Sequence, residues 1–122
     1  MRRLTILFAV CAGAAHAQFA APEAAPVSSA TLFTRQCAAC HAWEGAVRQG
    51  PNLAGVYGRP AGKADAFKYS AGLAQADWVW DEAHLDQYLT NPQAMVTGGV
   101  MAYRQANPDT RAQIIAYLKE RG

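Results

Sequence analysis

The 122-residue sequence has few lysines and no long apolar run. Lysine occurs only at positions 63, 68 and 119, and no basic cluster carries the interleaved aromatic residues typical of a nucleic-acid-binding surface. The apolar run over residues 4–15 is shorter than the about 20 residues that cross a bilayer as a helix. Strand-like alternation and internal repeats are also absent. We therefore expect a single all-α domain, with no nucleic-acid partner and no membrane span.

The first residues have the pattern of a secretory signal peptide. Arg2 and Arg3 give a positive start, the apolar run follows, and an Ala-His-Ala sequence supplies the small residues of a cleavage point. We expect residues 1–17 to be a signal peptide that directs the protein to the periplasm, with Gln18 as the mature start.

Removal of this leader changes the charge balance. The eleven Lys and Arg include Arg2 and Arg3, so nine basic residues remain against nine acidic ones, and the mature chain is formally neutral. Residues 18–27 are rich in Ala and Pro and predict a flexible tail. The folded domain is then expected over residues 28–122.

Cysteine is also scarce, and its placement carries the main functional signal. One of the three cysteines, Cys11, lies in the leader, which leaves Cys37 and Cys40 in the sequence Cys-Ala-Ala-Cys-His. A disulfide between residues so close would restrain little of the unfolded chain. A zinc site would need further ligands, and outside the leader and this motif only His84 is available as a histidine.

Cys-x-x-Cys-His is the attachment signature of a c-type haem. On a helix, Cys37 and Cys40 would lie one turn apart on one face, so both could form thioethers to one haem. His41 would then be an axial ligand of the iron. The sequence therefore predicts one covalently attached haem c.

Capping residues locate three helices. Ser28 or Ser29 can cap a first helix, whose buried face would include Phe33 and both haem cysteines. Asp81 can cap a second helix, with Trp80 and Leu85 as a hydrophobic staple and Asn91-Pro92 as its end. Asn107-Pro108-Asp109 begins a third. Residues 45–62 are rich in Gly and Pro and predict a loop, as do residues 63–77 and 93–106.

The second axial ligand stays open at this point. A methionine thioether would suit the iron, and both Met95 and Met101 lie in the third predicted loop. Their spacing does not decide between them. His84 is a third candidate, although a histidine near the start of an amphipathic helix is more often a solvated surface residue.

Several motifs resemble class I c-type cytochromes, that is, mitochondrial-type cytochrome c and its small soluble bacterial relatives. The resemblance covers nearly all of residues 28–121. In order, the motifs are Cys37-Ala38-Ala39-Cys40-His41, Gly50-Pro51-Asn52-Leu53, Gly58-Arg59, Trp80, Tyr88-Leu89, Asn91-Pro92, Met101 and Ile115-Ala116-Tyr117-Leu118-Lys119.

This resemblance implies the class I cytochrome c fold, with three main helices and long loops wrapped around the haem. It implies that the first and last helices cross at Phe33 and Tyr117. It also implies a set of haem-pocket roles. By this resemblance, His41 and Met101 are the axial ligands, and the Pro51 carbonyl accepts a hydrogen bond from the His41 ring. The side chains near the haem propionates are those of Arg59, Tyr69 and Trp80. Tyr88 lies near the Met101 sulfur.

Three departures from the family pattern affect the expected properties. Leu73 replaces a buried Asn and Gly99 replaces a Thr, which thins the polar network around the iron. The lysines that ring the haem edge in the mitochondrial protein are replaced by Gln93, Ala94 and Val100. We therefore expect docking on an apolar patch of Val96, Val100 and Tyr103 rather than through charge. The alternative is that these apolar side chains merely cover the haem.

The predicted function is that of a periplasmic monohaem electron-transfer protein, a monomer and not an enzyme. It would shuttle single electrons between a redox donor and a redox acceptor, with both axial positions filled. The alternative is a dedicated haem c subunit of a periplasmic dehydrogenase or oxidase complex. A haem sensor or peroxidase-like enzyme would instead need a five-coordinate iron.

Overall fold

The computed structural model describes residues 21–22 and 24–122. The predicted signal peptide and residues 18–20 and 23 of the predicted tail lie outside the described residues, whereas the described residues of that tail are exposed and have no regular structure. Five helices follow, and within the described part of the chain the only β-type pairing is an isolated bridge between Pro60 and Val79. The helices are α1 (Ser29–Gln36), α2 (Ala71–Ala74), α3 (Glu82–Thr90), α4 (Pro92–Met95) and α5 (Pro108–Glu120).

The three longer helices begin at the predicted capping residues. The Ser28 hydroxyl accepts a hydrogen bond from the backbone N–H of the residue three positions later, at 3.2 Å. The Asp81 carboxylate does the same at 2.9 Å, and the Asn107 side chain accepts from two N–H groups at 2.9 and 3.1 Å. Each cap satisfies backbone donors that the first turn of a helix leaves unpaired.

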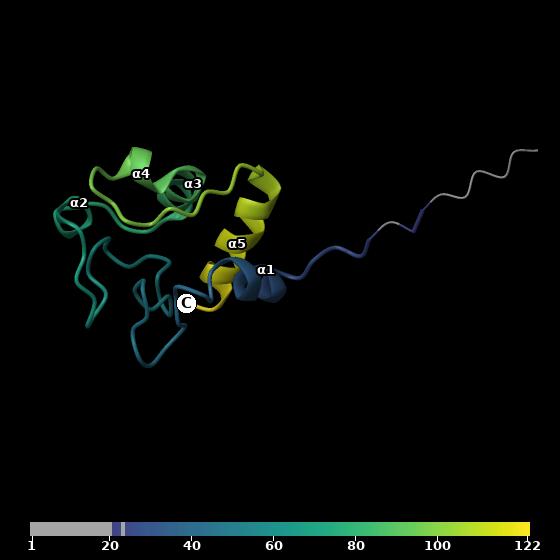
Figure 1. Ribbon diagram of the computed structural model, residues 1–122, viewed down its shortest axis with the longest axis horizontal. Coiled ribbons are helices and arrows are strands. Elements are labelled where there is room, and N and C mark those ends of the chain that lie inside the picture. Colours follow the sequence, from purple (N-terminus) through teal and green to yellow (C-terminus); the bar gives the residue numbers. More distant parts are fainter. Residues whose placement is uncertain (1–20, 23) are drawn as a thin grey trace, which may run out of the picture.

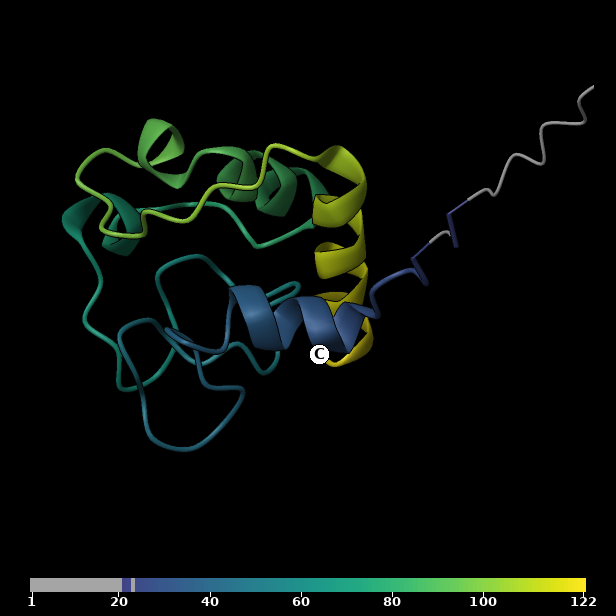
Figure 2. The ribbon, with the colours of Figure 1, turned by 45° about the vertical axis from the view of Figure 1, so that its right-hand side comes forward.

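The three longer helices lie on one side of the molecule, and the long loops lie on the other. In Figures 1 and 2, α5 crosses α1 near its lower end and runs beside α3 at its upper end. At the α1–α5 crossing, the rings of Phe33 and Tyr117 lie 5.5 Å apart, as the resemblance implied. The long chain between α1 and α2 forms the wall facing these helices.

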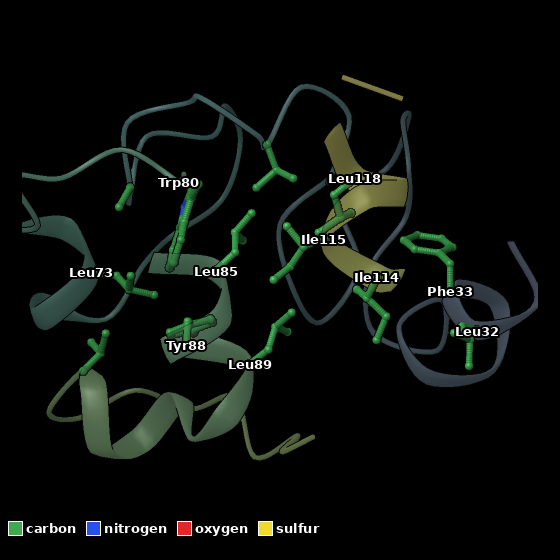
Figure 3. Close-up of a cluster of buried hydrophobic side chains, with 13 residues drawn as sticks. Leu32, Phe33, Leu73, Trp80, Leu85, Tyr88, Leu89, Ile114, Ile115 and Leu118 are labelled. Atoms are coloured by element: carbon green, nitrogen blue, oxygen red, sulfur yellow. The ribbon is translucent and has the colours of Figure 1, made fainter. Parts of the chain in front are cut away.

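The core connects these elements. Figure 3 shows Leu85 and Leu89 of α3 between Trp80 and Tyr88 on one side and the apolar side chains of α5 on the other. The α5 side chains are Ile114, Ile115 and Leu118, which are at most 4% exposed. None of the helices in the described part of the chain is both long and apolar enough to cross a membrane.

Two short helices lie where the sequence predicted loops. α4 follows α3 directly because Asn91-Pro92, which ends α3, also begins a new helix: the Asn91 side chain accepts from the Ala94 N–H at 3.3 Å, and Pro92 occupies the first turn. α2 packs closely on the chain after α4, since a Cβ at Gly72 would lie 2.7 Å from the Thr97 carbonyl oxygen. Both helices depend on contacts that local sequence patterns do not reveal.

Candidate haem-binding site

A cavity of about 350 Å³ lies between the helices and the loop wall. Its volume is in the range of sites that enclose a cofactor. Its walls bring together every residue that the sequence assigned to the haem pocket. These residues are Cys37, Cys40, His41, Pro51, Arg59, Tyr69, Trp80, Tyr88 and Met101.

The two cysteines lie in a turn after α1, not on the helix as predicted. α1 ends at Gln36, and the N–H groups of both Cys37 and Ala38 donate to the Phe33 carbonyl, at 2.9 and 3.1 Å. The chain then turns so that the His41 N–H donates to the Cys37 carbonyl at 2.9 Å. The two cysteines nevertheless line the same cavity, because the turn directs both of them toward it.

The two thiols have different surroundings. Cys37 is half-buried, and burial raises the pKa of its thiol to about 11. Cys40 is exposed, and its thiol donates to the Gln49 side chain at 3.3 Å. Since the thiolate is the reactive form, Cys37 is a poor nucleophile once it is enclosed by the fold.

The His41 ring is held in one tautomer and one orientation. Its Nδ1 lies 2.7 Å from the Pro51 carbonyl oxygen, which can only accept, so Nδ1 carries the proton and Nε2 keeps its lone pair. Burial lowers the pKa of His41, and the bond to Pro51 opposes this only in part. The imidazole is therefore neutral at neutral pH, which is the form that binds a metal.

Gly50 leaves the space that the His41 ring occupies. A Cβ at this position would lie 2.3 Å from Cε1 and 2.7 Å from Nδ1 of His41. No side chain larger than hydrogen fits there without moving the imidazole.

The structure separates the two candidate methionines. Met101 lines the cavity together with Tyr88, whereas Met95 belongs to α4 and packs against the hydrophobic core away from the cavity lining. Burial raises the pKa of Tyr88, with a smaller contribution from Tyr69. The Tyr88 phenol is therefore neutral and can donate to a weak acceptor such as a thioether.

A polar group of side chains lies in the loop wall of the cavity. Arg59 donates through its terminal nitrogens to the carbonyls of Ala54 and Asn52, at 3.1 and 3.2 Å. Its Nε is buried and has no hydrogen-bond partner among the described residues. The Ser70 hydroxyl is likewise buried without a partner there. The Tyr69 hydroxyl accepts from the Ala64 N–H at 3.2 Å and keeps its own proton to donate.

His84 lies outside the cavity lining. Its Nδ1 contacts the Asp81 carboxylate at 2.7 Å, and its ring stacks on Trp78 with 5.8 Å between centroids. Within the described residues, no three His, Cys, Asp or Glu side chains form a group that could hold a metal ion. The surface interpretation of His84 agrees with this arrangement.

Sequence reasoning missed several cavity residues. Val56, Phe67 and Ser70 lie in the loop wall, where no periodicity indicates which side chains face inward. Gln36 and Tyr103 line the cavity from opposite segments and are hydrogen-bonded to each other. Their proximity to the Cys-x-x-Cys-His motif and to Met101 in the sequence is the one signal that could have identified them.

The residues of the cavity fit a haem. Its walls are mostly apolar, as a porphyrin requires, and they also carry one neutral imidazole, one thioether and two thiols. The buried, unpartnered Arg59 Nε and Ser70 hydroxyl supply donors for an anionic group at the loop wall.

Comparison with known proteins gives the same answer. The family described as Cytochrome c matches residues 27–121. The chain belongs to the cytochrome c family. As a cytochrome c, it has one covalently bound haem c with iron and is a monohaem electron-transfer protein.

The relatives come from both eukaryotes and bacteria. The chain is 42% identical to cytochrome c of Theileria annulata over 102 residues, which cover 81% of this chain and 88% of the relative. It is 45% identical to cytochrome c2 iso-2 of Magnetospirillum fulvum over 85 residues, covering 68% and 88%. In structure it is similar to cytochrome cH from Methylobacterium extorquens, with a TM-score of 0.70 and 37% identity, covering 75% of this chain and 94% of that one. The predicted all-α class I cytochrome c fold is therefore confirmed.

Proposed function

We propose that this cytochrome c is a periplasmic electron carrier whose iron is bound by His41 and Met101. The observation that carries the proposal is that the free Nε2 side of a buried, neutral imidazole and one methionine line the same cavity as both thiols of the Cys-x-x-Cys-His motif. His/Met ligation raises the potential of a haem and leaves no open position for a substrate. The protein is accordingly not an enzyme in its own right.

Each side chain then has a defined task. Cys37 and Cys40 form the two thioethers that fix the haem in the cavity. The Pro51 carbonyl orients His41 and increases its basicity through the bond to Nδ1. The neutral Tyr88 phenol lines the same cavity as Met101 and would donate to its sulfur, and the haem, when bound, supplies one-electron Fe(II)/Fe(III) chemistry.

The loop wall binds the charged part of the haem. Arg59, Ser70 and Tyr69 hold donors that lack partners or have a spare proton, and Trp80 closes the same region with an apolar ring. A propionate needs such donors, because a buried carboxylate without hydrogen bonds is strongly destabilised.

Export through residues 1–17 completes the proposal. The positive start, apolar run and small residues of the leader support a periplasmic product that begins at Gln18. The intact mass of the secreted holoprotein tests this, and retention of residues 1–17 would contradict it.

Titration of the holoprotein with optical detection tests the ligation. We expect one single-electron transition and no binding of carbon monoxide to the reduced protein, because both axial positions are filled. Rapid stoichiometric binding of carbon monoxide would contradict the proposal and favour a five-coordinate sensor or peroxidase-like haem.

The partner is a redox protein that contacts an uncharged surface, and the carrier acts as a monomer. The side chain of Val100, next to Met101, is 80% exposed. Val96, which the sequence placed on the same docking patch, is only 2% exposed and cannot contact a partner. Co-purification with a larger chain would instead favour the alternative of a dedicated haem subunit.

A further inference from the structure

The chain that carries Met101 is fixed at its two ends but not along its backbone. At its start, Val96 is buried, and the Thr97 carbonyl packs against Gly72 of α2. At its end, the Gln105 N–H donates to the Leu89 carbonyl at 2.8 Å. Figure 2 shows this chain passing from α4 along the α2 side of the molecule and back to α5. We refer to residues 98–104 as the Met101 segment.

Between these ends the backbone has almost no hydrogen bonds. No backbone N–H or carbonyl of residues 100–104 forms a hydrogen bond with another described residue. Gly98 has a φ of +76° and Gly99 follows it, so the segment begins with two residues that have no side chain to restrain them. Segments of this kind open at low free-energy cost unless side chains hold them.

Met101 and Tyr103 pack against the hydrophobic core, and one cluster of three side chains adds hydrogen bonds to this restraint. The Tyr103 hydroxyl donates to the side-chain carbonyl of Gln36, the last residue of α1. The Gln105 side-chain amide donates to the same Gln36 oxygen at 3.0 Å and to the Tyr103 hydroxyl at 3.2 Å. For residues 100–104, the Tyr103 side chain makes the only hydrogen bonds found among the described residues.

The cluster connects the two sides of the cavity. Gln36 directly precedes Cys37, and Tyr103 follows Met101 by two positions, while all four residues line the cavity. The bond therefore joins the segment with the proposed thioethers to the segment with the proposed methionine ligand, across 67 positions of sequence.

We propose that Tyr103, Gln36 and Gln105 form a latch that holds the Met101 segment closed over the cavity and so limits how fast an external ligand can reach the iron. The inference rests on the proposed ligation by Met101. Tyr103 and Gln36 are positioning residues, since they act on the iron only through the segment that they hold.

Two conservative variants test the latch in the oxidised holoprotein. Tyr103→Phe removes the hydroxyl but keeps the ring, and Gln36→Met removes the amide but keeps the length. Each should raise the rate of imidazole binding by about threefold to tenfold, the effect of losing one or two hydrogen bonds that close the segment. Gln36→Met removes both bonds that join α1 to the segment, whereas Tyr103→Phe leaves the bond between Gln105 and Gln36. The double variant should therefore resemble Gln36→Met, because the two substitutions act on one cluster.

Tyr117→Phe is the matched control. It removes a tyrosine hydroxyl whose partner is Arg121, at 2.9 Å, outside the cavity lining. Its imidazole rate should equal that of the unmodified protein. Unchanged rates in Tyr103→Phe and Gln36→Met, or a double variant that shows the product of the two single effects, would overturn the latch.

Trypsin provides a readout that does not depend on the iron. Arg104 is exposed and lies within the Met101 segment, so cleavage after it should follow the opening of the segment. We expect Tyr103→Phe to accelerate cleavage at Arg104 and to leave cleavage at the exposed Lys68 unchanged. Faster cleavage without faster imidazole binding would overturn the proposed control of ligand access.

The same experiments separate this inference from the proposed function. If Met101→Ala keeps the sulfur-to-iron charge-transfer band, the ligation by Met101 fails, and the latch on iron access fails with it. If Met101→Ala loses the band but Tyr103→Phe changes neither rate, the ligation stands and the latch alone is wrong.

Discussion

At the scale of single residues, Met101 and Met95 provide the sharpest contrast. Met101→Ala should abolish the sulfur-to-iron charge-transfer band and lower the reduction potential, because the thioether favours ferrous iron. Met95→Ala is the matched control, since Met95 packs outside the cavity lining. It should leave both the band and the potential nearly unchanged. Optical spectra and redox titrations of the two holoproteins give the answer, and the opposite pattern would assign the ligand to Met95.

Gly50 gives a second prediction at this scale. In Gly50→Ala the new Cβ would lie 2.3 Å from Cε1 of His41, so the imidazole must move away from the Pro51 carbonyl. We expect a loss of about 1–3 kcal/mol in the free energy of unfolding, typical of an overpacked site, together with a changed haem spectrum. Denaturant titration followed at the haem absorbance measures both.

Gly45→Ala separates these two effects. Gly45 has a φ of +84°, so alanine is strained there, but nothing lies within 4 Å of its Cβ. This variant should be less stable and yet keep the spectrum. An unaltered spectrum in Gly50→Ala would show that the His41 ring tolerates the extra methyl group.

At the scale of secondary structure, the stability that the Asp81 cap gives to α3 should depend on pH. Hydrogen bonds from the His84 backbone and side chain hold the pKa of the Asp81 carboxyl below its usual value. A lowered pKa in the folded state means that the charged carboxylate stabilises the protein above the unfolded-state pKa and ceases to do so as the pH falls through the folded-state pKa.

The variant Asp81→Asn isolates this charge, because asparagine also caps helices well. It should be less stable than the unmodified protein at about pH 5, and the difference should vanish toward about pH 2. Unfolding of both proteins over this pH range is the measurement. A difference that persists at the acid end would mean that the carboxylate charge is not its source.

The sequence predicted helices well where their signals are local. Ser28, Asp81 and Asn107 each bond to backbone groups within three residues, so their patterns are legible in the chain itself. α2 and the contact between Gln36 and Tyr103 instead arise from residues far apart in sequence. No periodicity or capping pattern reports such contacts.

The haem site divides in the same way. The Cys-x-x-Cys-His motif predicts attachment from five adjacent residues. The sequence alone does not distinguish Met95 from Met101. Only the fold shows that the chain after α3 brings Met101, and not Met95, to the cavity lining. Helix periodicity also placed the cysteines on α1, whereas α1 ends one residue before Cys37.

At the scale of the whole molecule, the charge balance predicts how the protein meets its partner. With residues 1–17 removed as proposed, the chain is formally neutral, and Val100, next to Met101, is 80% exposed. Electrostatic steering should therefore be weak. Stopped-flow rates of electron transfer with the physiological partner should change little between low and high salt.

A fall of an order of magnitude or more over that range would show that another, charged surface docks the partner. Val100→Lys provides the complementary variant, since it introduces one positive charge at this position. With an acidic partner, it should make the rate more sensitive to salt than in the unmodified protein.

The packing of α1 on α5 joins the two ends of the domain. The Phe33, Trp43 and Tyr117 rings meet there, and the Arg121 guanidinium lies over the Trp43 ring, 4.7 Å from its centroid. The contact between Phe33 and Tyr117 closes a loop of about 80 residues, at an entropic cost on the order of 4 kcal/mol before any other contact forms. Contacts so distant in sequence slow folding. A haem attached next to α1 offers its apolar surface to Ile114 and Leu118 of α5, which line the same cavity. Attachment of the haem is therefore expected to speed folding, because it gives α1 and α5 a shared surface on which to pack.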